Sequence, residues 1–161
     1  MPAEELRPGD KAQDFSLASE SGRQVSLSEL KGKTVVLYFY PKDDTPGCTK
    51  EACGFESSLA QFSKKGVTIL GVSADNTASH QRFAKKYNLT FPLLSDLDFS
   101  VCKAYGVYKE KSLYGKTYWG IERTTFLIDE SGRISSIFPK VKVDGHIEAV
   151  LSAVKAMAAS R

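Results

Sequence analysis

The residues best suited to chemistry lie close together, between Tyr40 and Cys53, where prolines, a threonine hydroxyl and two thiols follow at short spacing. The chain leaves an apolar, aromatic run, turns through polar residues and enters a predicted helix at Pro46. Cys48 then falls in the first helical turn, where backbone N–H groups lack intrahelical partners and the helix dipole is positive. That setting favours the thiolate, the nucleophilic form of cysteine. Cys48 is therefore a candidate nucleophile, the alternative being a small buried hydrophobic residue.

The relation of Cys53 to Cys48 depends on the helix between them. Cys48 begins the predicted buried face of this helix, which continues at helical spacing through Ala52, Phe55, Leu59 and Phe62. In an intact helix the two cysteines point about 140° apart, with Cα atoms about 8–9 Å apart. A disulfide needs Cα atoms within about 7 Å. The pair could bond only if the first turns unwound, which suits a redox couple better than a structural disulfide.

The spacing Pro41-x-x-x-Thr45-x-x-Cys48 resembles the active-site motif of the peroxiredoxins. The longer string from Tyr40 to Cys53, YPKDDTPGCTKEAC, resembles the peroxiredoxin Q branch, also called bacterioferritin comigratory protein, and the likeness continues through residues 116–129. It covers nearly the whole chain. The resemblance implies a thiol-dependent peroxidase that needs no cofactor or metal and serves antioxidant defence and redox homeostasis.

The resemblance also implies a reaction sequence. Cys48 attacks hydrogen peroxide or an organic hydroperoxide and becomes a sulfenic acid. Cys53, as resolving cysteine, condenses with it to an intramolecular disulfide, and thioredoxin or a similar dithiol reductant recycles the enzyme.

Four further residues receive roles, each with a plainer alternative. By resemblance, Arg123 stabilises the thiolate and polarises the peroxide, where the alternative is a surface salt bridge. The Thr45 hydroxyl can donate to the thiolate or the peroxide, or can cap the helix. Pro41 shapes and shields the site or simply ends a strand, and the backbone N–H of Gly47 can point at bound peroxide.

Other candidates are weaker. Cys102 is the rival resolving residue, although its apolar spacing with neighbours favours the core. Tyr118 and Trp119 are expected near the site entrance. His80 and His146 are isolated in the sequence, so no metal site is predicted.

Two other function classes stay open. The first is a disulfide oxidoreductase on the same scaffold, which is disfavoured because Glu51 stands where a Cys-x-x-Cys motif would need its second cysteine. The second is a redox-sensing or holdase-like binding module, for which no sequence feature speaks.

Composition bounds the remaining possibilities. With 161 residues, 42% of them hydrophobic, we expect a single domain, residues 1–161. The net charge of +3 comes without a basic, aromatic-interleaved run, so no nucleic-acid partner is expected. Three cysteines make no disulfide framework, and no apolar run could span a membrane. We expect a cytoplasmic monomer.

The order of elements predicts an α/β protein that resembles the thioredoxin fold, with an N-terminal β-hairpin extension and a central mixed sheet flanked by helices. Residues 1–10 are expected to be an irregular arm, Ser26 and Glu29 to form a capping box, and residues 107–119 to be a long loop. The predicted strands are residues 15–18, 24–26, 34–40, 67–72, 91–94, 123–129 and 134–138. The predicted helices are the cysteine helix to about residue 64 and segments near 77–88, 96–106 and 147–157.

Overall fold

Strand β3 (Thr34–Phe39) is the centre of the fold because all six of its residues are buried. Alternate residues of a strand face opposite sides, and β3 accordingly serves two hydrophobic clusters. Val36 and Tyr38 belong to one cluster, whereas Val35 and Leu37 belong to the other. The structure, a computed structural model that describes residues 5–159, therefore confirms the predicted central strand covered on both faces.

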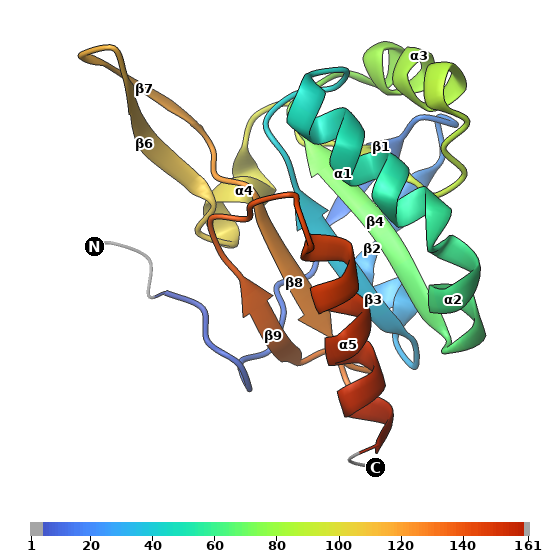
Figure 1. Cartoon of the computed structure of the whole chain (residues 1–161). Helices are drawn as coiled ribbons and strands as arrows, with labels where there is room; N and C mark the ends of the chain where they lie inside the picture. Colours follow the sequence, from blue (N-terminus) through green and yellow to red (C-terminus); the bar gives the residue numbers. More distant parts are fainter. Residues whose placement is uncertain (1–4, 160–161) are drawn as a thin grey trace.

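A seven-stranded mixed sheet surrounds β3 in the order β2-β1-β5-β4-β3-β8-β9 (Figure 1). On one side of β3, β4 (Val67–Ser73) and β5 (Leu93–Ser95) run parallel, and the hairpin of β1 (Ser16–Ser19) and β2 (Gln24–Ser26) adds antiparallel to β5. On its other side, β8 (Thr124–Ile128) runs antiparallel, followed by β9 (Ile134–Phe138). The predicted mixed sheet with an N-terminal hairpin is confirmed.

Helices cover both faces of this sheet. α1 (Pro46–Ser57), α3 (Thr77–Tyr87) and α5 (His146–Ala159) pack on the Tyr38 cluster, and α4 (Ser100–Ala104) packs on the other. The cysteine helix is not continuous to residue 64 as predicted. It breaks at Ser58, whose N–H is shared between the Gly54 and Phe55 carbonyls as at many helix ends, and α2 (Leu59–Lys64) follows. Among residues 5–159, no helix is long and apolar enough to cross a bilayer.

The predicted loop at residues 107–119 is wrong. This segment is a hairpin of β6 (Tyr108–Leu113) and β7 (Lys116–Ile121) that projects from the body (Figure 1). Tyr114 and Gly115 make its tight turn with positive φ values of 52° and 79°. Both strands are largely exposed, so they lack the alternation of apolar and polar residues that marks a half-buried strand.

The predicted capping box of Ser26 and Glu29 is wrong. The helical turn η1 (Leu27–Leu30) follows Ser26, but the Ser26 side chain makes no capping bond. Instead Asp14, distant in sequence, accepts from the Ser28 N–H at 2.9 Å. At the start of α4 the carboxylate of Asp96 accepts from the N–H groups of Val101 and Cys102. Of the predicted irregular arm, residues 5–10 form no helix or strand, and residues 1–4 lie outside the described part of the chain.

Candidate active site

The N-terminus of α1 positions Cys48. Buried β3 delivers the chain to the end of the sheet, the loop of residues 40–45 turns it, and Pro46 occupies the start of the helix. Cys48 follows in the first turn with 1% of its surface exposed. Tyr38 of β3 stacks on Phe55 of α1 with ring centroids 4.8 Å apart, which fixes the helix against the strand. The predicted placement of Cys48 at a strand-to-helix junction is confirmed.

Arg123 reaches the thiol from the neighbouring strand. It lies immediately before β8, and β8 pairs with β3 so that Thr124 lies opposite Phe39. Arg123 Nη2 approaches Cys48 Sγ at 3.2 Å. A Cβ atom on Gly47 would lie only 3.1 Å from the same Nη2, so glycine at this position leaves room for the guanidinium. The arrangement places a permanent positive charge and fixed N–H donors beside the sulfur.

Glu51 holds the other side of the guanidinium. Arg123 Nη1 donates to Glu51 Oε1 at 2.6 Å, and Glu51 is fully buried. Burial raises the pKa of the Glu51 carboxyl to about 7, although the charge of Arg123 and its hydrogen bond act in the opposite direction. Glu51 Oε2 has no hydrogen-bond partner among the described residues. The Glu51 carboxyl group therefore orients Arg123, although the buried position of Glu51 disfavours the charged carboxylate form.

His146 lies on the far side of Glu51. Its Nε2 is 3.8 Å from Glu51 Oε2 and 2.8 Å from the Thr125 hydroxyl. Burial, together with the charge of Arg123, lowers the pKa of His146 to about 4. A neutral imidazole therefore backs the Glu51 carboxyl at neutral pH.

Thr45 and Pro41 border the site from the 40–45 loop. Thr45 occupies the N-cap position of α1, but its side chain makes no capping bond, and its hydroxyl donates to the Lys42 carbonyl at 2.9 Å. Pro41 is exposed at the start of the loop. Tyr118 and Trp119, expected at the entrance, lie on the projecting β7, where Trp119 is 58% exposed and packs against Tyr108.

The three cysteines are all free and differ in setting. Cys53 is half-buried in α1, and burial with the nearby Glu56 charge raises the pKa of its thiol. Cys102 is fully buried, and burial together with Asp96 raises the pKa of its thiol. Because the thiolate is the reactive form, Cys102 is suited to the core, as predicted. Cys48 and Cys53 lie in one unbroken helix, the arrangement in which they cannot bond.

Three charged or titratable groups near the site were missed or misjudged from sequence. Glu51 was read only as a break in a redox motif, although its position three after Cys48 puts a carboxylate on the buried helix face. The histidines are not isolated, which corrects that expectation: His146 faces Glu51, and His80 lies 2.7 Å from Asp43. No local signal could reveal either pair, because the partners are 95 and 37 residues apart in the chain.

The chain is similar to several known proteins. A sequence model described as the AhpC/TSA family matches residues 8–137. A putative peroxiredoxin bcp from Coxiella burnetii is 60% identical, with 91% of this chain and 97% of that protein covered. The peroxiredoxin Bcp of Escherichia coli K12 is 47% identical, with 93% and 96% covered. The structure of the Xanthomonas campestris bacterioferritin comigratory protein, studied for alkyl peroxide reduction, is 47% identical with a TM-score of 0.86, and 89% and 92% of the two chains are covered.

Proposed function

Because the chain belongs to the AhpC/TSA family and is a peroxiredoxin of the Bcp, or Q, type, we propose that Cys48 is its peroxidatic cysteine. The observation that carries this assignment is the 3.2 Å approach of Arg123 Nη2 to Cys48 Sγ at the start of α1. A guanidinium there stabilises a thiolate and polarises an approaching O–O bond. Hydrogen peroxide and alkyl hydroperoxides are the proposed substrates, since the relative from Xanthomonas campestris was studied for alkyl peroxide reduction.

The first step is a displacement at oxygen. The Cys48 thiolate attacks the terminal peroxide oxygen, an S–O bond forms, the O–O bond breaks, and the leaving alkoxide or hydroxide takes a proton to become alcohol or water. Cys48 becomes a sulfenic acid. Arg123 donates to the reacting oxygens, the N–H groups of Gly47 and Cys48 point from the helix start, and the Thr45 hydroxyl turns from the Lys42 carbonyl to the peroxide. Pro41 borders the loop that carries these donors.

The second step is resolution by Cys53. The Cys53 sulfur attacks the Cys48 sulfenic acid, water leaves, and a Cys48–Cys53 disulfide forms after the first turns of α1 unwind. A dithiol reductant restores both thiols by exchange. We take thioredoxin or a similar protein as this reductant, and we place the enzyme in the reducing cytoplasm, as three free cysteines suit.

We further propose one domain over residues 1–161, because a single sheet draws strands from Ser16 to Phe138. We also propose that the enzyme is a monomer, that it needs no cofactor and that it binds no nucleic acid.

Replacing Cys48 with serine tests the assignment. Cys48→Ser should abolish peroxide consumption in the presence of thioredoxin and thioredoxin reductase, because a serine hydroxyl is not ionised at neutral pH. Cys53→Ser should still react once with peroxide, but should form no intramolecular disulfide and should turn over poorly with thioredoxin.

Cys102→Ser is the matched control. It should keep peroxide turnover while losing stability, since burying a hydroxyl without a partner costs about 1–3 kcal/mol. Substantial turnover by Cys48→Ser would overturn the proposed function. Loss of disulfide formation in Cys102→Ser rather than in Cys53→Ser would make Cys102 the resolving residue.

A further inference from the structure

A buried aspartate in the active-site loop is tied to α3. Asp43 belongs to the 40–45 loop, yet only 7% of the surface of this residue is exposed. Its carboxylate has three side-chain neighbours. The Tyr40 hydroxyl donates to Asp43 Oδ1 at 2.6 Å, the Ser79 hydroxyl donates to Oδ2 at 2.9 Å, and His80 Nδ1 lies 2.7 Å from Oδ2. Ser79 and His80 both come from α3. The loop that carries Thr45 and leads to Cys48 is thus held from within the protein.

His80 links this loop to the sheet. Its ring is fully buried, and its Nε2 lies 3.0 Å from the Leu94 carbonyl of β5, which can only accept a hydrogen bond. Nε2 therefore carries a hydrogen. A proton must also lie between Nδ1 and Asp43 Oδ2, because two lone pairs at 2.7 Å would repel each other. Both ring nitrogens are thus engaged, and the imidazole bridges β5 and the 40–45 loop.

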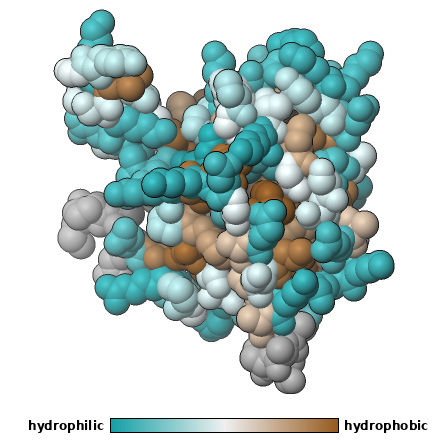
Figure 2. Space-filling model, in the orientation of Figure 1, coloured by the Kyte–Doolittle hydropathy of each residue, from teal (hydrophilic) through white to brown (hydrophobic). Residues whose placement is uncertain are grey.

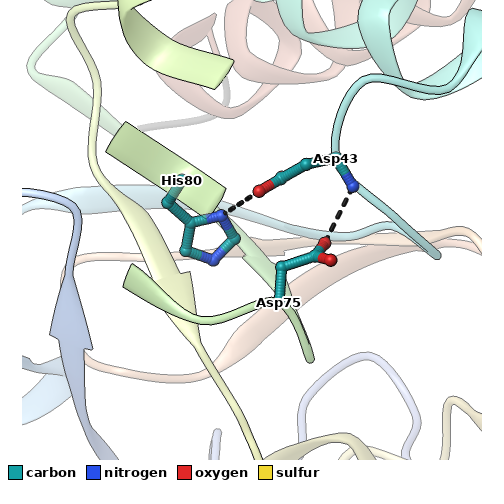
Figure 3. Close-up of side chains that lie close together, drawn as sticks. All are labelled: Asp43, Asp75 and His80. Carbon is teal, nitrogen blue, oxygen red and sulfur yellow. Dashed lines mark hydrogen bonds and ion pairs between the residues drawn. The ribbon is translucent and has the colours of Figure 1, made fainter. Parts of the chain in front are cut away.

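The loop backbone is fixed from the same side. The Asp43 N–H donates to Asp75 Oδ2 at 2.8 Å, and the Ser73 hydroxyl donates to the same oxygen at 2.7 Å. Figure 3 shows the arrangement, in which one dashed line joins the Asp43 carboxylate to the His80 ring and another joins the Asp43 backbone nitrogen to Asp75. Asp43, Asp75 and His80 lie close enough to suggest a metal site, but their facing atoms are already paired with one another. The cluster is a hydrogen-bonded anchor.

The next residue supplies an instructive contrast. Asp44 also binds α3, through Lys86 Nζ at 2.9 Å and the Tyr87 hydroxyl at 2.6 Å. Its side chain is 42% exposed, and that of Lys86 is 58% exposed. Exposed ion pairs contribute little because water screens them. Of the two attachments of the loop to α3, the buried one through Asp43 has the stronger hold on its position.

We propose that His80 is a positioning residue of the peroxidase reaction. Its Nδ1 holds Asp43, and Asp43 holds the 40–45 loop, so that Thr45 and the start of α1 receive the peroxide beside Arg123. Asp43 lies two residues before Thr45 and five before Cys48, close enough for a shift of its backbone to reach both. The inference rests on the proposed function, since it concerns how the Cys48 site is kept in register.

Two substitutions separate the two hydrogen bonds of His80. Asparagine places its amide nitrogen at the position of Nδ1, so His80→Asn can still donate to Asp43 while it loses the bond to Leu94. Glutamine places its amide near Nε2, so His80→Gln can reach Leu94 but abandons Asp43. Each variant keeps one of the two hydrogen bonds. The two variants are matched because both replace the imidazole ring with a side-chain amide. Far-UV circular dichroism and thermal midpoints check that both fold.

The rate of Cys48 oxidation is the readout. The fully reduced protein is mixed with hydrogen peroxide in a stopped-flow instrument, and the loss of the Cys48 thiol is followed without a reductant. His80→Gln should lower the second-order rate constant by about tenfold, equivalent to about 1.4 kcal/mol in the barrier. His80→Asn should stay within about threefold of the wild type. Asp43→Asn, which keeps the shape of the anchor and weakens the acceptor, should fall in the same direction as His80→Gln.

Alkylation of Cys48 by iodoacetamide distinguishes positioning from general damage. This reaction needs an accessible thiolate but no donors from the loop, so its rate should change by less than about twofold in both histidine variants. Equal loss of the peroxide rate in both variants, a parallel loss of alkylation, or a wild-type peroxide rate in His80→Gln would each overturn the positioning role. Failure of the proposed function itself would look different, because Cys48→Ser would then retain peroxide turnover.

Discussion

At the scale of single residues, the site is a row of contacting groups in which the positive charge of Arg123 lies between two acidic groups. Arg123 lies between the Cys48 sulfur and the Glu51 carboxyl, at 3.2 and 2.6 Å. Glu51 in turn faces the neutral imidazole of His146. Because Glu51 is buried, its pKa rises to about 7. The balance between carboxylate and carboxylic acid behind Arg123 therefore changes across the neutral range.

The two shifted groups should leave opposite marks on stability. The pKa of Glu51 rises from 4.5 to about 7, so between these values the folded protein holds more protons than the unfolded chain and stability falls as pH rises. The pKa of His146 falls from 6.5 to about 4, so stability rises with pH in that window. In the wild type the two trends oppose each other between about pH 4.5 and 6.5. In Glu51→Gln only the His146 effect remains, so the free energy of unfolding should rise with pH. In His146→Gln only the Glu51 effect remains, so the free energy of unfolding should fall with pH.

Urea unfolding at several pH values between about 4.5 and 7.5 measures these slopes, each at most about 1.4 kcal/mol per pH unit. The wild type is the reference, since the difference between its slope and the slope of each variant gives the contribution of the group that the variant removes. Identical slopes in the wild type and both variants would contradict the opposed titrations.

At the scale of elements, α1 holds Cys48 and Cys53 apart, and the proposed disulfide between them requires its first turns to unwind. Its buried residues Ala52 and Phe55 pack against β3. Gly54 lies against α5 so closely that a Cβ there would be 2.7 Å from Ile147 Cγ1. Stable packing of this helix and formation of a Cys48–Cys53 disulfide are therefore mutually exclusive, and oxidation must cost local structure.

Amide exchange in the two redox states should reveal that change. The reduced protein should protect residues 49–55, whereas peroxide-treated protein should exchange faster there, because the intervening turns unwind. Mass spectrometry should find the Cys48–Cys53 cross-link in the same sample. Protection of α3 and of β3 should stay unchanged.

Cys53→Ser provides the control for this experiment, since it can be oxidised without forming the cross-link and should keep its protection. Equal exchange of residues 49–55 in reduced and oxidised wild type would rule out local unwinding.

At the scale of the whole molecule, one sheet unites segments from both halves of the chain. β1 near the start pairs with β5, whereas β8 from the later half pairs with β3 and β9 pairs with β8 (Figure 1). The body presents a mixed hydrophilic and hydrophobic surface, from which the β6–β7 hairpin stands apart (Figure 2). The hairpin carries the single tryptophan, Trp119, and exposed Tyr114.

Unfolding of the body should accordingly be a single transition. Thermal unfolding followed by far-UV circular dichroism and by the near-UV signal of the buried tyrosines should give one midpoint, because Tyr38 and Tyr40 lie in the shared core. Trp119 fluorescence reports the hairpin instead and can change earlier. Separate midpoints for the two circular dichroism signals would argue against one domain.

The sequence determined what depends on neighbouring residues. The apolar run of β3, the helical spacing after Cys48 and the apolar spacing of α5 are local patterns, and each predicted an element that the structure contains, although the helix after Cys48 breaks at Ser58. The sequence likewise predicted that a helix begins at Pro46 and that Cys48 lies in its first turn, because proline is favoured at the first helical position. These features form because one or both faces of an element are buried, and the spacing of apolar residues in the sequence predicts which faces those are.

Only the tertiary structure decided the pairs that tune the site. Arg123 meets Glu51, and His80 meets Asp43, because sheet pairing and helix packing bring distant segments together, and no short-range pattern encodes such contacts. The β6–β7 hairpin escaped prediction for a related reason. Both of its faces meet water, so burial imposed no alternation on its residues, and the strands are held by backbone hydrogen bonds that any sequence can form.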